Sequence, residues 1–145
     1  MEPFTIPSSG GWTCPECGRW FGRTKQGHEC APALSLDEYF STGPERERPI
    51  FEVVRAHLES LGPVHIEAVS VGIFFKRRRT FVELRPMVRW QALSFVLNRT
   101  VTSDRIARTI KGGGRTFHVV NIRTADDVDE RVRDWLTESY EACAD

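Results

Sequence analysis

Three cysteines and one histidine lie within seventeen residues near the start of the chain, at Cys14, Cys17, His28 and Cys30. The Cys-Pro-Glu-Cys-Gly run from Cys14 has the form of a tight turn that brings two thiolates to one point, with Gly18 free to adopt a positive φ. His28 and Cys30 are two residues apart, so an extended segment places both side chains on the same side. The pattern therefore predicts a structural Zn²⁺ whose four coordination positions are all filled by protein.

Two other interpretations of the cysteines remain open, a redox Cys-x-x-Cys pair and plain buried thiols. No βαβ pattern surrounds the motif, which disfavours the redox pair. Ten residues separate Cys17 from His28 and one separates His28 from Cys30, unlike a two-Cys, two-His finger that presents a base-reading helix. The sequence therefore favours a finger that braces its neighbour, with Trp20 and Phe21 as its small apolar core. Cys143 is expected to be a buried small apolar residue.

Glycine and proline residues and the spacing of apolar residues divide the rest of the chain into segments. We expect a flexible tail over residues 1–11, the zinc finger over 12–31, a linker over 32–48 with a short helical turn at 34–40, and one α+β domain over 49–142. Pro49 suits the first turn of a helix whose apolar residues recur at helical spacing until Gly62-Pro63 ends it.

After this helix the apolar period changes to two. The stretches 64–68, 71–75, 80–84, 90–97 and 116–122 have the β-branched and aromatic content of strands and predict an antiparallel meander. Residues 105–110 suggest a short helical turn and 112–114 a glycine hinge. A capping-box pattern at Thr124 opens a final amphipathic helix that includes Trp135 and Tyr140. The predicted fold class is α+β, with a zinc-knuckle finger, a helix, an antiparallel sheet of about four to five strands and a C-terminal helix.

The zero formal net charge conceals a basic block in residues 76–123, where twelve Lys and Arg side chains accompany only Glu83 and Asp104. Such density, interleaved with aromatic residues, predicts binding of nucleic acid or another polyanion. The alternative is that this charge is solvated, or neutralised by the acidic residues of 124–145. The predicted anion-binding residues are Lys76, Arg77, Arg78, Arg79, Arg85, Arg89, Arg99, Lys111, Arg115 and His118.

A search for catalytic patterns finds no Gly-x-Ser-x-Gly elbow, no His-Glu-x-x-His helix and no paired carboxylates, so we expect a protein without enzymatic activity. No apolar run approaches the roughly 20 residues of a membrane helix. The first residues lack the pattern of a secretory signal, which predicts a cytoplasmic protein with no membrane partner.

The chain resembles a bacterial family of unknown function, numbered five-six-five-five, in the version that carries an N-terminal Cys-Cys-His-Cys finger. The resemblance rests on the run from Trp12 to Arg19 with His28-Glu-Cys30. It also rests on Thr80-Phe-Val-Glu-Leu-Arg-Pro with Trp90 and Ser94-Phe-Val-Leu, and on the segment from Thr124 through Trp135 to Tyr140. It implies the extent of the domain and the zinc finger, but no catalytic residues. The resemblance also implies a relation to domains that look like appendages of nucleases and other defence-type proteins.

Three functional hypotheses follow. The leading one is a non-enzymatic, zinc-containing module that binds nucleic acid or another polyanion through a basic sheet face. The second is a protein-interaction or accessory domain whose basic block meets an acidic partner. The third is a small-molecule binder or enzyme that uses His118, Arg115 and the glycine turn at 112–114.

Overall fold

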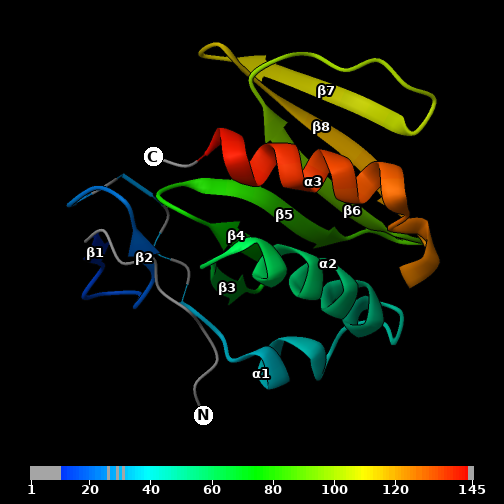
Figure 1. The fold of residues 1–145 in the computed structure, drawn as a ribbon. Helices are drawn as coiled ribbons and strands as arrows, with labels where there is room; N and C mark the ends of the chain where they lie inside the picture. The colour runs from blue at the N-terminus through cyan, green and yellow to red at the C-terminus, as the bar shows by residue number, and fades with distance from the viewer. Residues whose placement is uncertain (1–10, 26, 29, 31, 144–145) are drawn as a thin grey trace.

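The computed structural model describes residues 11–25, 27–28, 30 and 32–143, so the predicted tail lies outside the described residues except for Gly11. A two-stranded ribbon at the cysteine cluster precedes a larger domain (Figure 1). The elements in chain order are β1 (Trp12–Thr13), β2 (Trp20–Phe21), α1 (Leu36–Phe40), α2 (Glu47–Leu61), β3 (His65–Val69), β4 (Gly72–Lys76), β5 (Thr80–Pro86), β6 (Gln91–Leu97), β7 (Ile106–Gly112), β8 (Arg115–Ile122), the 3-10 turn η1 (Ala125–Asp127) and α3 (Glu130–Ala142). The α+β class, with an N-terminal cysteine cluster and a C-terminal helix, is confirmed.

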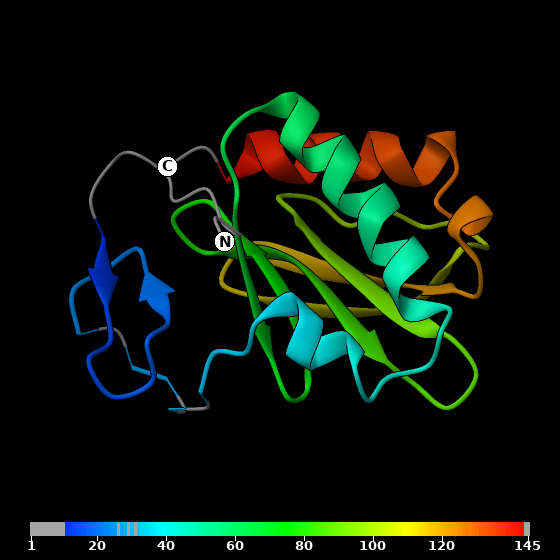
Figure 2. The ribbon, with the colours of Figure 1, turned by 90° about the horizontal axis from the view of Figure 1, so that it is seen from below.

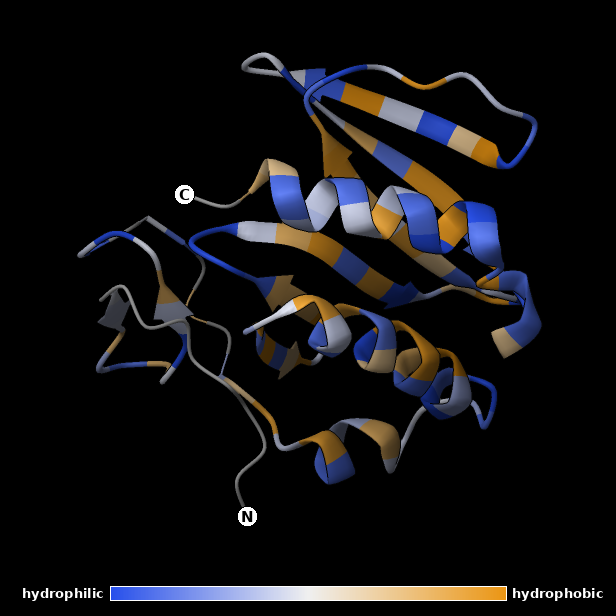
Figure 3. Cartoon of the chain, in the orientation of Figure 1, coloured by the Kyte–Doolittle hydropathy of each residue, from blue (hydrophilic) through white to orange (hydrophobic). Residues whose placement is uncertain are grey.

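Helices α2 and α3 lie side by side on one face of the sheet (Figures 1 and 2). Each carries buried apolar residues at helical spacing, and Figure 3 shows apolar and polar residues interspersed along both helices. Phe51 of α2 and Leu136 of α3 are fully buried in the core that the helices form with the sheet. Among the described residues, no helix has the length and apolar character needed to cross a membrane.

The sheet has the strand order β3-β4-β5-β6-β8-β7, and every neighbouring pair is antiparallel. The first four strands form the predicted meander, and the β7–β8 hairpin then returns so that β8 pairs with β6 and β7 takes the outer edge. At the opposite edge, Leu34 donates its backbone N–H to the carbonyl of Ala68 in β3 at 2.7 Å. That edge is therefore partly covered, whereas β7 pairs with β8 alone among the described strands.

The prediction of a helical turn at 105–110 is wrong, because residues 106–110 belong to β7. Six strands result, instead of the expected four to five. Gly113 and Gly114 both have positive φ, 60° and 77°, which is the conformation that a two-residue hairpin turn requires. The glycine run therefore closes the β7–β8 hairpin, and it does not join the stretches 90–97 and 116–122 as a hinge.

Alternation along the strands gives the sheet two different faces. In β6, Leu93 and Phe95 point into the core beneath the helices, whereas Ala92 and Ser94 point to the other side, which we call the open face. We call the end at which β3, β5 and β8 begin the finger end, because the two-stranded ribbon lies beyond it (Figure 2). The opposite end is the far end.

Candidate metal centre

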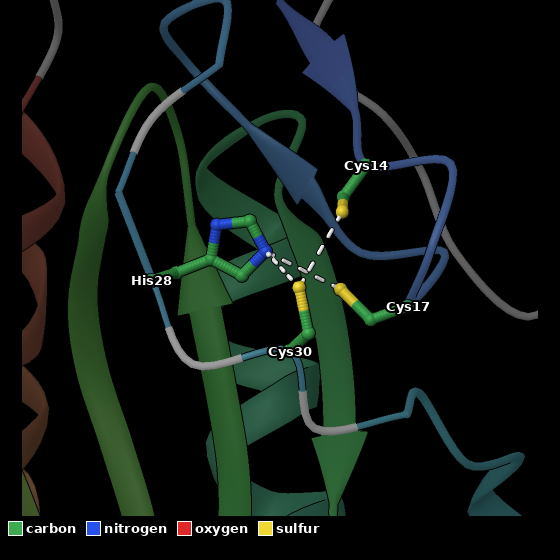
Figure 4. Close-up of side chains that lie close together, drawn as sticks. All are labelled: Cys14, Cys17, His28 and Cys30. Atoms are coloured by element: carbon green, nitrogen blue, oxygen red, sulfur yellow. Dashed lines mark hydrogen bonds between the residues drawn. The ribbon is translucent and has the colours of Figure 1, made fainter.

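The four predicted ligand atoms converge (Figure 4): the sulfur atoms of Cys14, Cys17 and Cys30 and a ring nitrogen of His28 all lie within 4.8 Å of one another. The Cys14 and Cys30 Sγ atoms are 3.8 Å apart, and His28 Nε2 lies 3.4 Å from both Cys17 Sγ and Cys30 Sγ. A tetrahedral ion with metal–sulfur bonds of about 2.3 Å holds its sulfur ligands about 3.8 Å apart. A disulfide would need about 2.05 Å. The cluster therefore has the dimensions of a metal site.

Local backbone structure positions the first two ligands. The Gly18 N–H donates to the Cys14 carbonyl at 2.9 Å and the Cys14 N–H to the Arg19 carbonyl at 2.8 Å, which closes the turn between β1 and β2. Gly18 has a φ of 78°, as that turn predicts. The ring of Phe21 lies 4.1 Å from the His28 imidazole, measured between centroids, and thus holds the third ligand against the ribbon.

The ionisation of the thiols also favours a bound cation. Burial raises the pKa of the Cys14 thiol, but hydrogen bonds from the backbone N–H groups of Cys17 and Glu16 outweigh it and bring this pKa to about 6. The hydrogen bond to Cys14, together with burial, raises the pKa of Cys30 to about 11. Three sulfur atoms at this separation cannot all ionise unless a positive charge lies between them. Three thiolates and one imidazole fit an ion that accepts soft sulfur ligands.

A buried charged cluster joins this centre to the sheet, and we call it the Glu67 cluster: Arg19, Trp20, His65, Glu67 and Lys76. The Glu67 carboxylate lies 3.1 Å from Arg19 Nε, 2.9 Å from His65 Nε2 and 2.8 Å from Lys76 Nζ, and it accepts the Trp20 backbone N–H. Lys76 Nζ also donates to the Trp20 carbonyl at 2.7 Å. Strands β3 and β4 therefore hold the ribbon through side chains that alternate onto their open face.

Lys76 is thus not the exposed anion-binding residue that the sequence predicts, because its exposed fraction is only 2%. Burial lowers the pKa of Lys76, while the adjacent Glu67 opposes that shift. Burial raises the pKa of Glu67, but the hydrogen bond with His65 and the charge of Lys76 prevail and bring it to about 2. A divalent ion with three thiolates has a net charge of −1, which the surplus positive charge of Arg19 and Lys76 over Glu67 would balance.

A second contact between ribbon and domain runs from Gly22 to the β4–β5 turn. Arg78 Nη2 donates to the Gly22 carbonyl at 2.6 Å. A Cβ atom at Gly22 would lie 2.1 Å from the Arg78 carbonyl oxygen, which is far inside van der Waals contact. Only glycine allows the two backbones to approach this closely.

We therefore expect Gly22→Ala to destabilise the docking of the finger by about 1–3 kcal/mol, the usual cost of overpacking. Limited proteolysis should cleave the variant faster than the wild type between the finger and α1. Gly27→Ala is the matched control, since a Cβ atom there meets nothing within 4 Å. Equal cleavage rates for the two variants would contradict the prediction.

Comparison with protein families identifies the larger domain. The sequence model of one family, described as a domain of unknown function (DUF5655), matches residues 36–142. The chain belongs to this family. The DUF5655 domain thus comprises α1, α2, the six-stranded sheet and α3, including α1 in the stretch predicted as a linker, while the cysteine cluster precedes the matched residues. No curated protein and no solved structure matches the chain.

The ten residues predicted to bind anions do not share one face of the DUF5655 domain. Two of them, Lys76 and His118, are buried. Two lie toward the far end of the sheet, Arg85 near the end of β5 and Arg89 in the β5–β6 turn. The other six lie at the finger end, in the turns and strand ends that border it: Arg77, Arg78, Arg79, Arg99, Lys111 and Arg115.

Contacts with α3 engage part of this basic charge. Arg99 forms a bidentate ion pair with Glu138, in which both nitrogen–oxygen distances are 2.8 Å. Arg77 donates to the Tyr140 carbonyl at 3.0 Å, and its guanidinium lies 4.1 Å from the Tyr140 ring. Arg115 Nη2 lies 3.5 Å from Cys143 Sγ. Only the contact with Glu138 neutralises a charge, so the alternative that the C-terminal helix neutralises the basic block applies, among these three arginines, to Arg99.

Two other basic residues of the finger end, Arg79 and Lys111, differ from these three. Arg79 and Lys111 are exposed, and neither forms an ion pair with an acidic residue that the structure describes. His118, by contrast, has no exposed surface, and its Nε2 accepts the backbone N–H of Val101 at 2.9 Å. It lies on the core face, so it does not share an accessible site with Arg115.

Proposed function

We propose that this protein is a non-enzymatic, zinc-containing module whose finger end binds nucleic acid through phosphate groups. The observation that carries the proposal is the position of Arg79 and Lys111, exposed and without acidic partners among the described residues. Arg79 precedes β5 and Lys111 lies near the end of β7. The strands β5, β6, β8 and β7 are about 4.8 Å apart, so the finger end of the sheet is about 14 Å wide between these two residues. Several phosphates span such a width, because a strand of a duplex carries one charge per roughly 3.4 Å.

Zinc is the ion we assign to the cluster, and its role is structural. Cys14, Cys17, His28 and Cys30 supply three thiolates and one imidazole, which is a donor set that zinc occupies in tetrahedral sites. All four positions are taken by protein, so no position is left for a substrate or for water. The ion would hold the ribbon against the Glu67 cluster and thereby fix the position of the β4–β5 turn with Arg79.

The test compares two double variants with the same charge change at opposite ends of the sheet. Arg79→Glu with Lys111→Glu should weaken binding of a labelled single-stranded or duplex oligonucleotide by about tenfold or more at roughly 50 mM salt, measured by fluorescence anisotropy. Arg85→Glu with Arg89→Glu is the control and should weaken it by about threefold at most, through net charge alone. Equal losses in both variants, or no binding by the wild type, would refute the proposal.

A second candidate function is interaction with an acidic protein segment, and the outer edge of β7 favours it. This seven-residue strand pairs only with β8 among the described strands, and all its residues after Ile106 are exposed. An extended acidic segment could add to this edge beside Arg108 and Lys111. A protein that copurifies after nuclease treatment, and that Lys111→Glu releases, would support this function over nucleic-acid binding.

A further inference from the structure

The open face of the sheet is hollowed into a groove of about 710 Å³. Its floor is formed by the small side chains of Ala92 and Ser94 in β6. Strand β5 supplies one wall, where Arg85 and Glu83 are the register partners of these two residues. Strand β8 supplies the other wall with Asn121 and Val119. Small residues between larger ones thus produce a channel that follows β6.

Apolar side chains surround this floor. Phe117 of β8 and Ile110 of β7 are register partners and lie toward the finger end. Trp90 and Met87 lie in the β5–β6 turn at the far end, and the guanidinium of Arg123 lies 5.3 Å from the Trp90 ring. Both the volume and the apolar lining with a few polar groups are typical of sites for small molecules.

Among the described residues that line the groove, one carries an uncompensated positive charge, while Arg123 lies beyond the lining over the Trp90 ring. The Arg85 guanidinium is paired with the Glu83 carboxylate at 3.1 Å, so these two charges cancel. Arg108 of β7 is the register partner of Val119, is exposed, and forms no ion pair with any acidic residue that the structure describes. An apolar channel whose lining holds this one unpaired guanidinium complements a ligand that has an apolar body and one negative charge.

We propose that this groove binds a small amphipathic anion, with its apolar body over Ala92 and Ser94 and its single carboxylate, sulfonate or phosphate at Arg108. The inference does not depend on nucleic-acid binding, because the groove lies on the open face and the residues of that proposal border the finger end. A nucleic-acid strand is a poorer fit, since its successive phosphates would meet only one unpaired cation, Arg108, among the described lining residues. A neutral ligand would gain no electrostatic attraction from Arg108.

The probe for this site is 1-anilinonaphthalene-8-sulfonate, an apolar aromatic body with one sulfonate, whose fluorescence rises in apolar surroundings. We expect saturable binding of one molecule per chain. N-phenyl-1-naphthylamine has the same aromatic body without the sulfonate, and it should bind about tenfold more weakly. Amide chemical shifts should change upon binding in β6, β7 and β8 and not in the finger.

Three variants locate the site. Ala92→Phe fills the floor of the groove and should abolish saturable binding, while Arg108→Glu should weaken binding of the sulfonate probe about tenfold and leave the neutral probe unchanged. Lys111→Glu is the matched control, because it makes the same charge change on the same strand. Its register partner is Thr116, on the core side, so its effect should be less than about twofold.

The proposal fails if Ala92→Phe still binds the sulfonate probe with wild-type affinity while retaining the wild-type circular dichroism spectrum. It also fails if the neutral probe binds as tightly as the anionic one, or if Arg108→Glu and Lys111→Glu have equal effects. Arg108 is exposed, so its variant should fold even if Ala92→Phe does not. The charge comparison therefore remains decisive by itself.

Discussion

Removal of the metal should unfold the finger and leave the DUF5655 domain folded. The apolar cluster of the finger consists of Cys14, Cys17 and Phe21, with Trp12 packed against it. Such a cluster is too small to stabilise a fold, and structural zinc in fingers contributes roughly 10–16 kcal/mol of apparent binding free energy. The sheet and its helices have a separate core of buried residues, which does not depend on the ion.

The measurement begins with metal analysis, in which protein purified without chelator should contain about one zinc per chain. Cys17→Ser should lower this content to about a tenth or less, because one thiolate of the tetrahedron is lost. Cys143→Ser is the matched control: Cys143 is also buried but lies at the end of α3, outside the cluster, so its metal content should not change.

Amide resonances then separate the two parts of the chain. A chelator should collapse the signals of β1 and β2 into the narrow range of unfolded residues, while those of β5, β6 and β8 keep their dispersion. Protein without zinc, or with another metal bound as tightly, would contradict the assignment of the ion. Loss of dispersion throughout the chain would contradict the independence of the DUF5655 core.

The first two candidate metal ligands, Cys14 and Cys17, were predictable because their arrangement is local. The turn that contains Cys14 and Cys17 closes by hydrogen bonds within six residues, and its glycine is needed for a positive φ. Helix α2 was predictable for a related reason, since its buried residues recur at the period of the helix itself. In both cases the local sequence pattern determines the backbone conformation, and no contact with a distant segment of the chain is needed to predict it.

The Glu67 cluster was not predictable in this way, because its members come from three separate segments. Lys76 precedes three arginines and reads as part of an exposed basic run, yet alternation in β4 places it on the face that the finger covers. The sequence offered one signal for this cluster: Glu67 and Lys76 are charged residues within the otherwise largely apolar strands β3 and β4. Such a charge is buried only when a partner from another segment neutralises it.

Strand β7 was not predicted because its conformation also depends on a contact with another segment of the chain. Ile106–Gly112 contains few apolar residues and lies at the outer edge of the sheet, so nothing in its own period marks it as a strand. Its conformation is set by the ladder to β8 and by the turn at Gly113 and Gly114. The groove depends on this ladder, since Arg108 and Ile110 reach the open face only as members of β7.

Glu67→Gln should be the most destabilising single substitution outside the metal ligands. It removes the carboxylate that pairs with Arg19 and with the buried Lys76, and breaking a buried ion pair costs about 3–5 kcal/mol. Thermal unfolding should shift downward by roughly 10–20 °C. Glu83→Gln is the matched control, because it removes the same charge from the same face of the sheet. Glu83 lies in β5, two strands from Glu67, and it is partly exposed. Its shift should be a few degrees at most.

A double-mutant cycle isolates the pair. Lys76→Met alone should also destabilise the protein, since it leaves the Glu67 carboxylate with one fewer donor. The variant with both changes should be less destabilised than the sum of the two single variants, by about 1–3 kcal/mol, because neither charge is then left buried alone. Strict additivity would mean that the 2.8 Å contact between Lys76 Nζ and Glu67 has no energetic role.

The pH dependence of this stabilisation follows from the low pKa of Glu67, about 2 in the folded protein against an ordinary value near 4.5. A carboxylate whose pKa falls on folding stabilises the folded state above its unfolded pKa, and this contribution disappears as the pH falls toward the folded value. The difference in stability between wild type and Glu67→Gln should therefore be constant from pH 7 to 5 and shrink from about pH 4.5 toward 2. A difference that already declines between pH 7 and 5 would show that Glu67 titrates near neutrality and is not held ionised by Arg19, His65 and Lys76.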